Sequence, residues 1–301
     1  MTDLLCIGTT LIDSFIFGFT GEAYSNTGFR AGSAKLCPGG EAFNVSVTAS
    51  RLGLKTKVLS HIGNDSAGKL IETELREAGV DTAHIVRDDE PTPVTTMFIA
   101  EDGSRKSITN GAHKYNFHPE KYLSVIMGAK NVALCSLMRA PFNDSEIIYE
   151  VLRAAKAEGA VTYCDTKIPN FVKIGFEDIR ESAPLIDYLT PNADEAKFFS
   201  GYDDPEDAAD YFLSLGIKNV LIKLGPNGCL FKNESETLRL PAFVIDVVDA
   251  TGCGDNMLAG LIASGDLKFA SMCAGLCLSK TGAACGVESR EQVERELLKR
   301  L

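Results

Sequence analysis

One stretch of this sequence carries its strongest signal: Asp249-Ala250-Thr251-Gly252-Cys253-Gly254-Asp255, which runs directly into Asn256-Met257-Leu258-Ala259-Gly260. A helix that begins near Cys253 would leave the amides of Gly252, Cys253 and Gly254 unpaired at its positive end. Glycines let a phosphate approach such a backbone closely, and Asp255 in the first helical turn could accept a proton from a hydroxyl group. Phosphoryl transfer needs both parts, donors for the moving charge and a residue that orients the nucleophile. A plain glycine-rich turn is the simpler alternative, but the two acidic residues that bracket Thr-Gly-x-Gly favour the catalytic interpretation.

On the N-terminal side of this stretch, short apolar segments alternate with helical patterns. This alternation predicts an α/β fold with a mostly parallel sheet and helices on both faces. The segment 254–301 has the pattern of three further helices. The predicted strands lie at 4–9, 58–61, 132–135, 161–164, 188–190 and 220–223, and the predicted helices at 41–52, 66–78, 144–158, 172–182 and 192–216.

Two insertions, 14–36 and 93–110, are strand-like and have no helix between their strands. In the second, Asp102-Gly103-Ser104 is a good hairpin turn. We expect the two insertions to form a small β-sheet lid beside a single domain that spans 1–301. The exposed edge of such a sheet could also pair two subunits into a homodimer.

Two weaker motifs lie elsewhere in the chain. Pro38-Gly39-Gly40-Glu41-Ala42-Phe43-Asn44 precedes a helix, where its glycines permit close approach of a ligand and Asn44 offers a donor and an acceptor to a polyol. Asn192 and Glu195 follow a strand, and this spacing is typical of a helix capping box. Beside phosphates, the same carboxamide and carboxylate would suit a hydrated magnesium ion.

Composition and charge exclude several classes of function. The net charge of −11 disfavours binding to nucleic acid, although a nest of backbone amides can still hold a small phosphate ligand. The nine cysteines show neither Cys-x-x-Cys nor zinc-site spacing, so we expect reduced thiols in a cytoplasmic protein. The chain opens without a basic leader and has no apolar run of the ~20 residues that a membrane span needs.

Taken in order, these motifs resemble the ribokinase-like (PfkB) family of carbohydrate kinases, and the resemblance covers nearly the whole chain. It implies a Rossmann-like α/β fold with a β-sheet lid, and a reaction that moves a phosphoryl group from ATP, with Mg²⁺, to a small sugar. Some members also bind K⁺. By resemblance, Asp255 is the catalytic base, and Gly252, Cys253 and Gly254 form the anion hole. The remaining functional positions implied by the family are Asp13, Gly39, Gly40 and Asn44 for the sugar, Lys223, Gly225, Gly228, Thr251 and Gly286 for the nucleotide, Asn192 and Glu195 for magnesium and phosphate, and Asp249 for a monovalent cation.

The chain departs from the family pattern at three places. Cys253 replaces a small alanine, Glu41-Ala42-Phe43 replaces the Lys-Gly-Ala of ribokinases, and Asp165-Thr166-Lys167 replaces the Asp-Pro-Asn of fructokinases and ketodeoxygluconate kinases. The first two leave the kinase interpretation intact, and together the departures leave the acceptor open, with a ketose such as fructose or a ketodeoxy sugar acid favoured.

Two alternatives remain beside a sugar kinase. A nucleoside kinase of the same fold would need aromatic side chains on which the nucleoside base can stack, and Tyr24, Phe29 and Phe43 could supply them. A catalytically silent sugar-binding regulator would have lost the base, whereas Asp255 is present.

Overall fold

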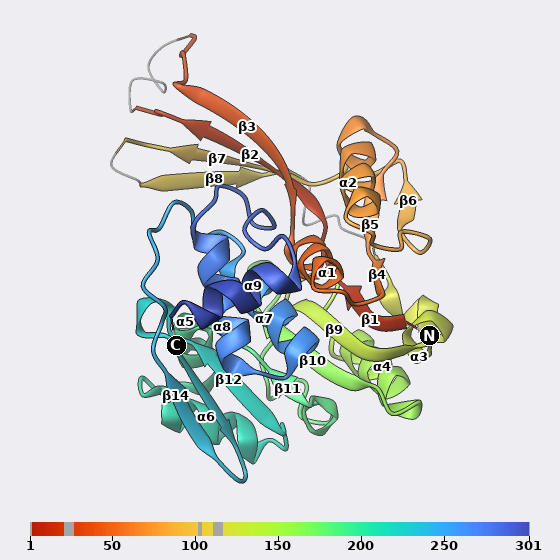
Figure 1. The fold of residues 1–301 in the computed structure, drawn as a ribbon. Coiled ribbons are helices and arrows are strands. Elements are labelled where there is room, and N and C mark those ends of the chain that lie inside the picture. The colour runs from red at the N-terminus through yellow and green to blue at the C-terminus, as the bar shows by residue number, and fades with distance from the viewer. Residues whose placement is uncertain (1, 21–26, 102–103, 111–116, 301) are drawn as a thin grey trace.

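The computed structural model describes residues 2–20, 27–101, 104–110 and 117–300. Within them, eight strands form a central sheet in the order β14-β13-β12-β11-β10-β9-β1-β4 (Figure 1). The strands from β12 to β4 run parallel, and β13 and β14 add an antiparallel edge. The predicted, mostly parallel sheet is therefore confirmed. The strand bounds are β1 Thr2–Ile7, β4 Thr56–Leu59, β9 Ala129–Leu137, β10 Val161–Thr166, β11 Tyr188–Leu189, β12 Asn219–Lys223, β13 Cys229–Asn233 and β14 Thr237–Leu240.

Helices cover both faces of this sheet, because successive strand side chains point to opposite sides. Leu5 and Ile7 of β1 belong to the core that includes α4 and α6, whereas Leu4 and Cys6 belong to the core that includes α1 and α7. The three helices expected in the C-terminal segment are present, and no helix of the described residues is long and apolar enough to cross a bilayer. The helix bounds are α1 Glu41–Arg51, α2 Ser66–Glu77, α3 Leu123–Met127, α4 Ser145–Ala157, α5 Ala193–Ser200, α6 Pro205–Ser214, α7 Cys253–Ser264, α8 Leu267–Leu278 and α9 Arg290–Leu298.

A second sheet, which we call the lid sheet, stands beside the main body (Figure 1). Its order is β3-β2-β7-β8, with β2 parallel to β7 and the other two pairs antiparallel. It is the small sheet predicted from the two insertions, but its strands start before residue 14 and end after residue 36. The predicted turn residues Asp102 and Gly103 lie outside the described residues. The bounds are β2 Leu11–Phe17, β3 Ser33–Gly39, β7 Val94–Ile99 and β8 Arg105–Thr109, and a separate parallel pair joins β5 His61–Gly63 to β6 Val86–Asp88.

Two predicted helices are wrong in detail. The segment 172–182 forms turns whose backbone bonds span three residues, and Asp178 accepts a hydrogen bond from the Gly175 amide at 2.8 Å. This local side-chain bond competes with α-helix formation. The predicted helix 192–216 is two helices, because Gly201 ends α5 at φ +78° and Pro205 opens α6.

Candidate active site

A cleft of about 1290 Å³ opens at the carboxyl ends of β9, β10 and β12, and the lid sheet and the N-terminus of α7 line it as well. Ligands of open α/β sheets bind at this edge. Most of the predicted site residues line the cleft: Asp13, Gly40, Asn44, Asn192, Glu195, Lys223, Gly225, Gly228, Thr251, Gly252, Cys253, Gly254 and Asp255.

The N-terminus of α7 is built as the sequence predicts, except that the Cys253 amide donates a long hydrogen bond of 3.5 Å to the Ala250 carbonyl. Gly252 is the N-cap at φ +77°, and no side chain caps this end of the helix. A Cβ on Gly252 would lie 2.3 Å from the Cβ of Ala283, and one on Gly254 would lie 3.0 Å from Nζ of Lys223. First-turn amides have no carbonyl partner within their own helix. The terminus therefore offers backbone donors to the cleft, with the Lys223 ammonium close to them.

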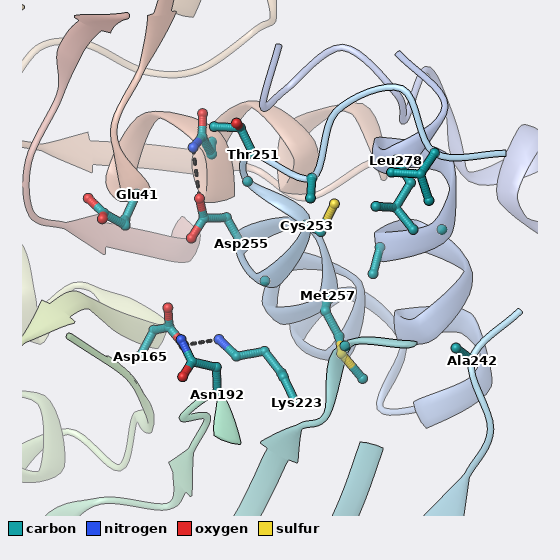
Figure 2. Close-up of a pocket in the computed structure, with 18 of the residues that line it drawn as sticks. Glu41, Asp165, Asn192, Lys223, Ala242, Thr251, Cys253, Asp255, Met257 and Leu278 are labelled. Atoms are coloured by element: carbon teal, nitrogen blue, oxygen red, sulfur yellow. Dashed lines mark hydrogen bonds and ion pairs between the residues drawn. The ribbon is translucent and has the colours of Figure 1, made fainter. Parts of the chain in front are cut away.

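Asp255 lies in the first turn of α7 and is 6% exposed. Its Oδ2 accepts a hydrogen bond of 2.7 Å from Nδ2 of Asn44, which comes from α1 (Figure 2). Burial raises the pKa of Asp255 to about 7, and the carboxylate of Glu41 adds to this effect, while Lys167 and the Asn44 hydrogen bond oppose it. A carboxylate with a pKa near neutrality is suited to accept a proton from a hydroxyl group.

Polar groups at the other wall of the cleft suit a hydroxyl-rich ligand. Oδ1 of Asn44 is buried and has no hydrogen-bond partner among the described residues. Asp13 projects from β2, and burial, with Glu41 and Asp249 nearby, raises its pKa to about 7. Gly40 adopts φ +90°, and a Cβ there would lie 2.5 Å from the carbonyl oxygen of Thr9.

Asn192 and Glu195 form the capping box that their spacing indicates. Oδ1 of Asn192 accepts from the Glu195 amide and Oε2 of Glu195 accepts from the Asn192 amide, each at 2.9 Å. Thr166 also donates to Oε2 of Glu195 at 3.0 Å. Burial, with Asp165 nearby, raises the pKa of Glu195. Both side chains line the cleft, so the cap does not remove them from it.

Lys223 and Asp165 face each other at the ends of β12 and β10 (Figure 2). Their ion pair measures 2.5 Å, and Thr190 donates to the same oxygen of Asp165 at 2.7 Å. The Asp165 side chain is 3% exposed and that of Lys223 is 13% exposed. This pair fixes the direction of the lysine toward the α7 terminus.

Three predicted site residues do not line the cleft. Gly39 makes room for Asp13, whose Oδ2 would lie 2.5 Å from a Cβ at position 39. Gly286 packs against α8, where a Cβ would lie 2.2 Å from the Leu276 carbonyl oxygen. Asp249 accepts from the amide and hydroxyl of Thr251 at 2.9 and 2.7 Å and from the amide of Gly282 at 3.0 Å, and so joins two loops.

Cys253 lines the cleft and is half-buried. Its thiol contacts that of Cys277, and this contact together with burial raises the pKa of Cys277. All nine cysteines are free, and Cys285 is the exposed one.

The sequence analysis did not assign a site role to Lys167, Glu41 or Arg139, which line the cleft. Lys167 directly follows β10 and Arg139 lies two residues after the end of β9, and this position at a parallel sheet edge could have identified them.

Of the three aromatic residues considered for a nucleoside, the two that the structure describes do not line the cleft. Tyr24 lies outside the described residues. Phe43 is 3% exposed in the core, and Phe29 packs on Phe19, so neither lines the cleft.

The family model described as "pfkB family carbohydrate kinase" matches residues 1–290. The chain belongs to this family. Membership in this family makes the protein a carbohydrate kinase. The predicted family resemblance and the predicted enzyme class are therefore both confirmed.

Relatives and solved structures agree with this membership. A ribokinase of Staphylococcus aureus (strain COL) is 24% identical over 97% of this chain and 98% of its own length. A 2-dehydro-3-deoxygluconokinase of Bacillus subtilis (strain 168) is 27% identical over 74% of this chain and 72% of its own length.

Among solved structures, the ribokinase of Arabidopsis thaliana with ribose and ATP has a TM-score of 0.83 at 24% identity, with 98% of each chain covered. An Escherichia coli protein provisionally described as ribokinase II, with ATP and Mg²⁺, has a TM-score of 0.83 at 21% identity, with 100% of each chain covered. These likenesses show the ribokinase-like fold.

Proposed function

We propose that this protein transfers the γ-phosphoryl group of ATP to a hydroxyl of a small sugar or sugar acid. One observation carries the proposal: Asp255, which is bonded to Asn44, lies in the first turn of a helix whose uncapped N-terminus faces the same cleft. A base and a set of anion donors are thereby within one helical turn of each other, as in-line transfer requires.

Each residue has a defined task in this reaction. The acceptor oxygen forms a bond to the terminal phosphorus while the bond from that phosphorus to the bridging oxygen of ADP breaks, and the acceptor proton passes to Asp255. The amides of Gly252, Cys253 and Gly254, with Lys223, hold the charge that develops on the phosphoryl oxygens. Asp13, Gly40 and Asn44 orient the acceptor.

A magnesium ion would neutralise phosphate charge during the transfer. The donor set fits such an ion, because Asn192 and Glu195 present a carboxamide and a carboxylate to the cleft, and magnesium keeps several of its waters. The apolar end of the cleft, lined by Phe243, Val244 and Ile245, suits the base of the nucleotide. A monovalent cation such as K⁺ near Asp249 stays a prediction from the resemblance.

The lining of the cleft favours a sugar over a nucleoside as acceptor. At the acceptor end the described lining residues are polar or aliphatic, with Asp13, Asn44, Lys167 and Arg139 among them. A ketose or a ketodeoxy sugar acid fits this set of hydrogen-bonding and charged groups better than a purine or pyrimidine does.

The surroundings of the enzyme are proposed on separate grounds. Nine free cysteines support a reducing, cytoplasmic location.

Two exposed apolar residues on the lid sheet support a homodimer that pairs two lid sheets. Leu36 and Ile108 are 63% and 67% exposed. Light scattering tests this assembly, and a monomer at working concentration would contradict it.

The direct test of the proposed function is a coupled ADP-release screen with MgATP over sugars, sugar acids and nucleosides. We expect release above the acceptor-free rate with a sugar or sugar acid. Release with nucleosides alone would make the protein a nucleoside kinase. Nucleotide binding without turnover of any acceptor would contradict the proposed reaction.

A further inference from the structure

Two of the places where this chain departs from the family pattern meet in space. Glu41 is the first residue of α1, directly after Gly40, and Lys167 directly follows β10. Oε1 of Glu41 lies 3.4 Å from Nζ of Lys167, and both side chains line the cleft. A pair of opposite charges thus replaces the lysine and the asparagine that the resembled patterns would place at these two positions.

The backbone around Lys167 aims its side chain into the cleft. The register between β10 and β9 shifts between Cys164 and Thr166, and the Lys167 amide then donates to the Leu137 carbonyl at 2.9 Å. Such an irregularity turns a strand and re-aims the next side chain. The Lys167 side chain is 32% exposed and therefore remains accessible to a ligand.

The ammonium of Lys167 has donor capacity left for a substrate. Its electrostatic neighbours are Glu41, Asp255, Asp165 and Glu195. Asp165 is already bonded to Lys223, and Asp255 to Asn44.

Glu41 is therefore the ion-pair partner of Lys167 among the described residues, and their separation exceeds the ~2.7–2.9 Å of a charge-assisted hydrogen bond. An ammonium has three N–H donors. The pair holds the charge in place and occupies no more than one of those donors, so two remain for a substrate.

We propose that Lys167 is a catalytic residue that contacts the transferring phosphoryl group from the acceptor side of the cleft, with Glu41 as the residue that positions it. This inference rests on the proposed phosphoryl transfer. On the ATP side, the phosphoryl group would be held by the amides of Gly252, Cys253 and Gly254 and by Lys223. On the acceptor side, beside Asp255, it would be held by Lys167. Lys167 keeps its proton throughout, so it supplies charge and a hydrogen bond and takes no part in the proton transfer.

Nucleotide binding tests the contact without any acceptor. Calorimetry with MgADP and with the magnesium complex of AMP-PNP, a non-hydrolysable ATP analogue, compares the wild type with Lys167→Gln and Lys167→Arg. We expect Lys167→Gln to weaken AMP-PNP by about tenfold, the size of one charge-assisted hydrogen bond, and to leave ADP unchanged. Lys167→Arg should recover most of this loss. An equal change for both nucleotides would overturn the contact.

Lys57→Gln is the matched control. Lys57 pairs with Asp81 at 3.6 Å and is 29% exposed, close to the values for Lys167, but it lies on β4 outside the cleft. It should leave the binding of both nucleotides unchanged. Thermal melts of every variant identify those that have lost their fold.

Turnover of an acceptor found in the screen separates catalysis from charge compensation. Lys167→Gln should lower kcat by about 10²–10³-fold. If Lys167 contacts the phosphoryl group, the double variant Glu41→Gln/Lys167→Gln stays as slow as Lys167→Gln. Recovery of the wild-type rate in the double variant would mean that Lys167 only neutralises Glu41, and would overturn the proposal. A wild type that binds AMP-PNP but turns over no acceptor would refute the proposed function and leave the binding result to decide on Lys167.

Discussion

Asn44 and Asp255 are 211 residues apart in the sequence and are joined by a hydrogen bond of 2.7 Å between α1 and α7. This bond links the glycine motif at the start of α1 to the glycine motif at the start of α7. It leaves Oδ1 of Asn44 buried without a partner among the described residues, ready to accept from a hydroxyl of the acceptor. One side chain thereby touches both the base and the proposed acceptor position.

Asn44→Leu should therefore impair catalysis through Asp255. The variant keeps the size of the side chain but removes a donor that lowers the pKa of Asp255. We expect kcat/KM for the acceptor to fall roughly 10- to 100-fold at pH 7, the loss of one hydrogen bond to a charged group. The midpoint of the pH profile should move to a higher pH, because the pKa of Asp255 rises. Thr48→Val is the control, because Thr48 lies one turn further along α1 and donates to Asn256 at 2.9 Å, outside the cleft. It should lower stability and leave the pH profile in place. If the pH profile of Asn44→Leu equals that of the wild type, Asn44 does not influence the pKa of Asp255.

The activity of the wild type should depend on the ionisation of Asp255. Because burial raises the pKa of this base to about 7, kcat/KM should rise with pH through about 7 and then level off. The stability should change in the opposite direction. An aspartate in an unfolded chain has a pKa of about 3.9, so between about pH 4 and 7 the folded state holds a proton that the unfolded state has lost.

This protonated, buried carboxyl stabilises the fold fully below about pH 4, and the contribution is lost as the pH rises through about 7. Chemical denaturation at pH 5 and pH 8 measures the effect. The free energy of unfolding of the wild type should fall more between these values than that of Asp255→Asn. An equal fall in the free energy of unfolding for the two proteins would show that folding does not raise the pKa of Asp255.

Alanine at Asn192 or at Glu195 separates a helix cap from a magnesium ligand. If the pair only caps α5, each variant should lose about 1 kcal/mol of stability with the magnesium dependence of kcat unchanged. If the pair also serves the metal, the magnesium concentration needed for half-maximal activity should rise, which is the result we expect. Asp204→Ala is the matched control, because Asp204 caps α6 through the Glu206 and Asp207 amides and is exposed. It should cost stability alone.

The lid sheet should close over the acceptor. The lid-sheet residues Asp13, Met97, Lys106 and Ser107 line the cleft, so an occupied cleft has contacts with this sheet. Amide hydrogen exchange in β2, β3, β7 and β8 should slow when acceptor binds, whereas exchange in β13 and β14 at the far edge of the central sheet should not. Identical exchange with and without acceptor would rule out closure.

Local signals explain what the sequence predicted well. The start of α7 at Cys253 follows from its glycines and from the acidic residue in its first turn, and the alternation of short apolar strands with helices follows from burial on both faces. The capping box at Asn192 was visible for the same reason. In each case the interacting residues are close in the sequence.

Relationships that depend on the topology could not be predicted. The ion pair of Glu41 with Lys167 exists only because β10 ends near the start of α1 across the sheet edge. Gly286 was assigned to the nucleotide by the family resemblance, which does not reveal that this glycine packs against α8 and does not line the cleft. The predicted helix 172–182 failed because the side chain of Asp178 provides a local turn that periodicity does not reveal.

The most direct test of the account is the turnover of Asp255→Asn with the acceptor that the screen identifies. The carboxamide has nearly the same size and can still bond to Asn44, but it cannot take a proton. We predict that kcat falls by about 10²–10⁴-fold, with the Kd for MgATP unchanged and the fold intact in thermal melts. A folded Asp255→Asn variant that retains near-normal kcat would contradict the assignment of Asp255 as the base.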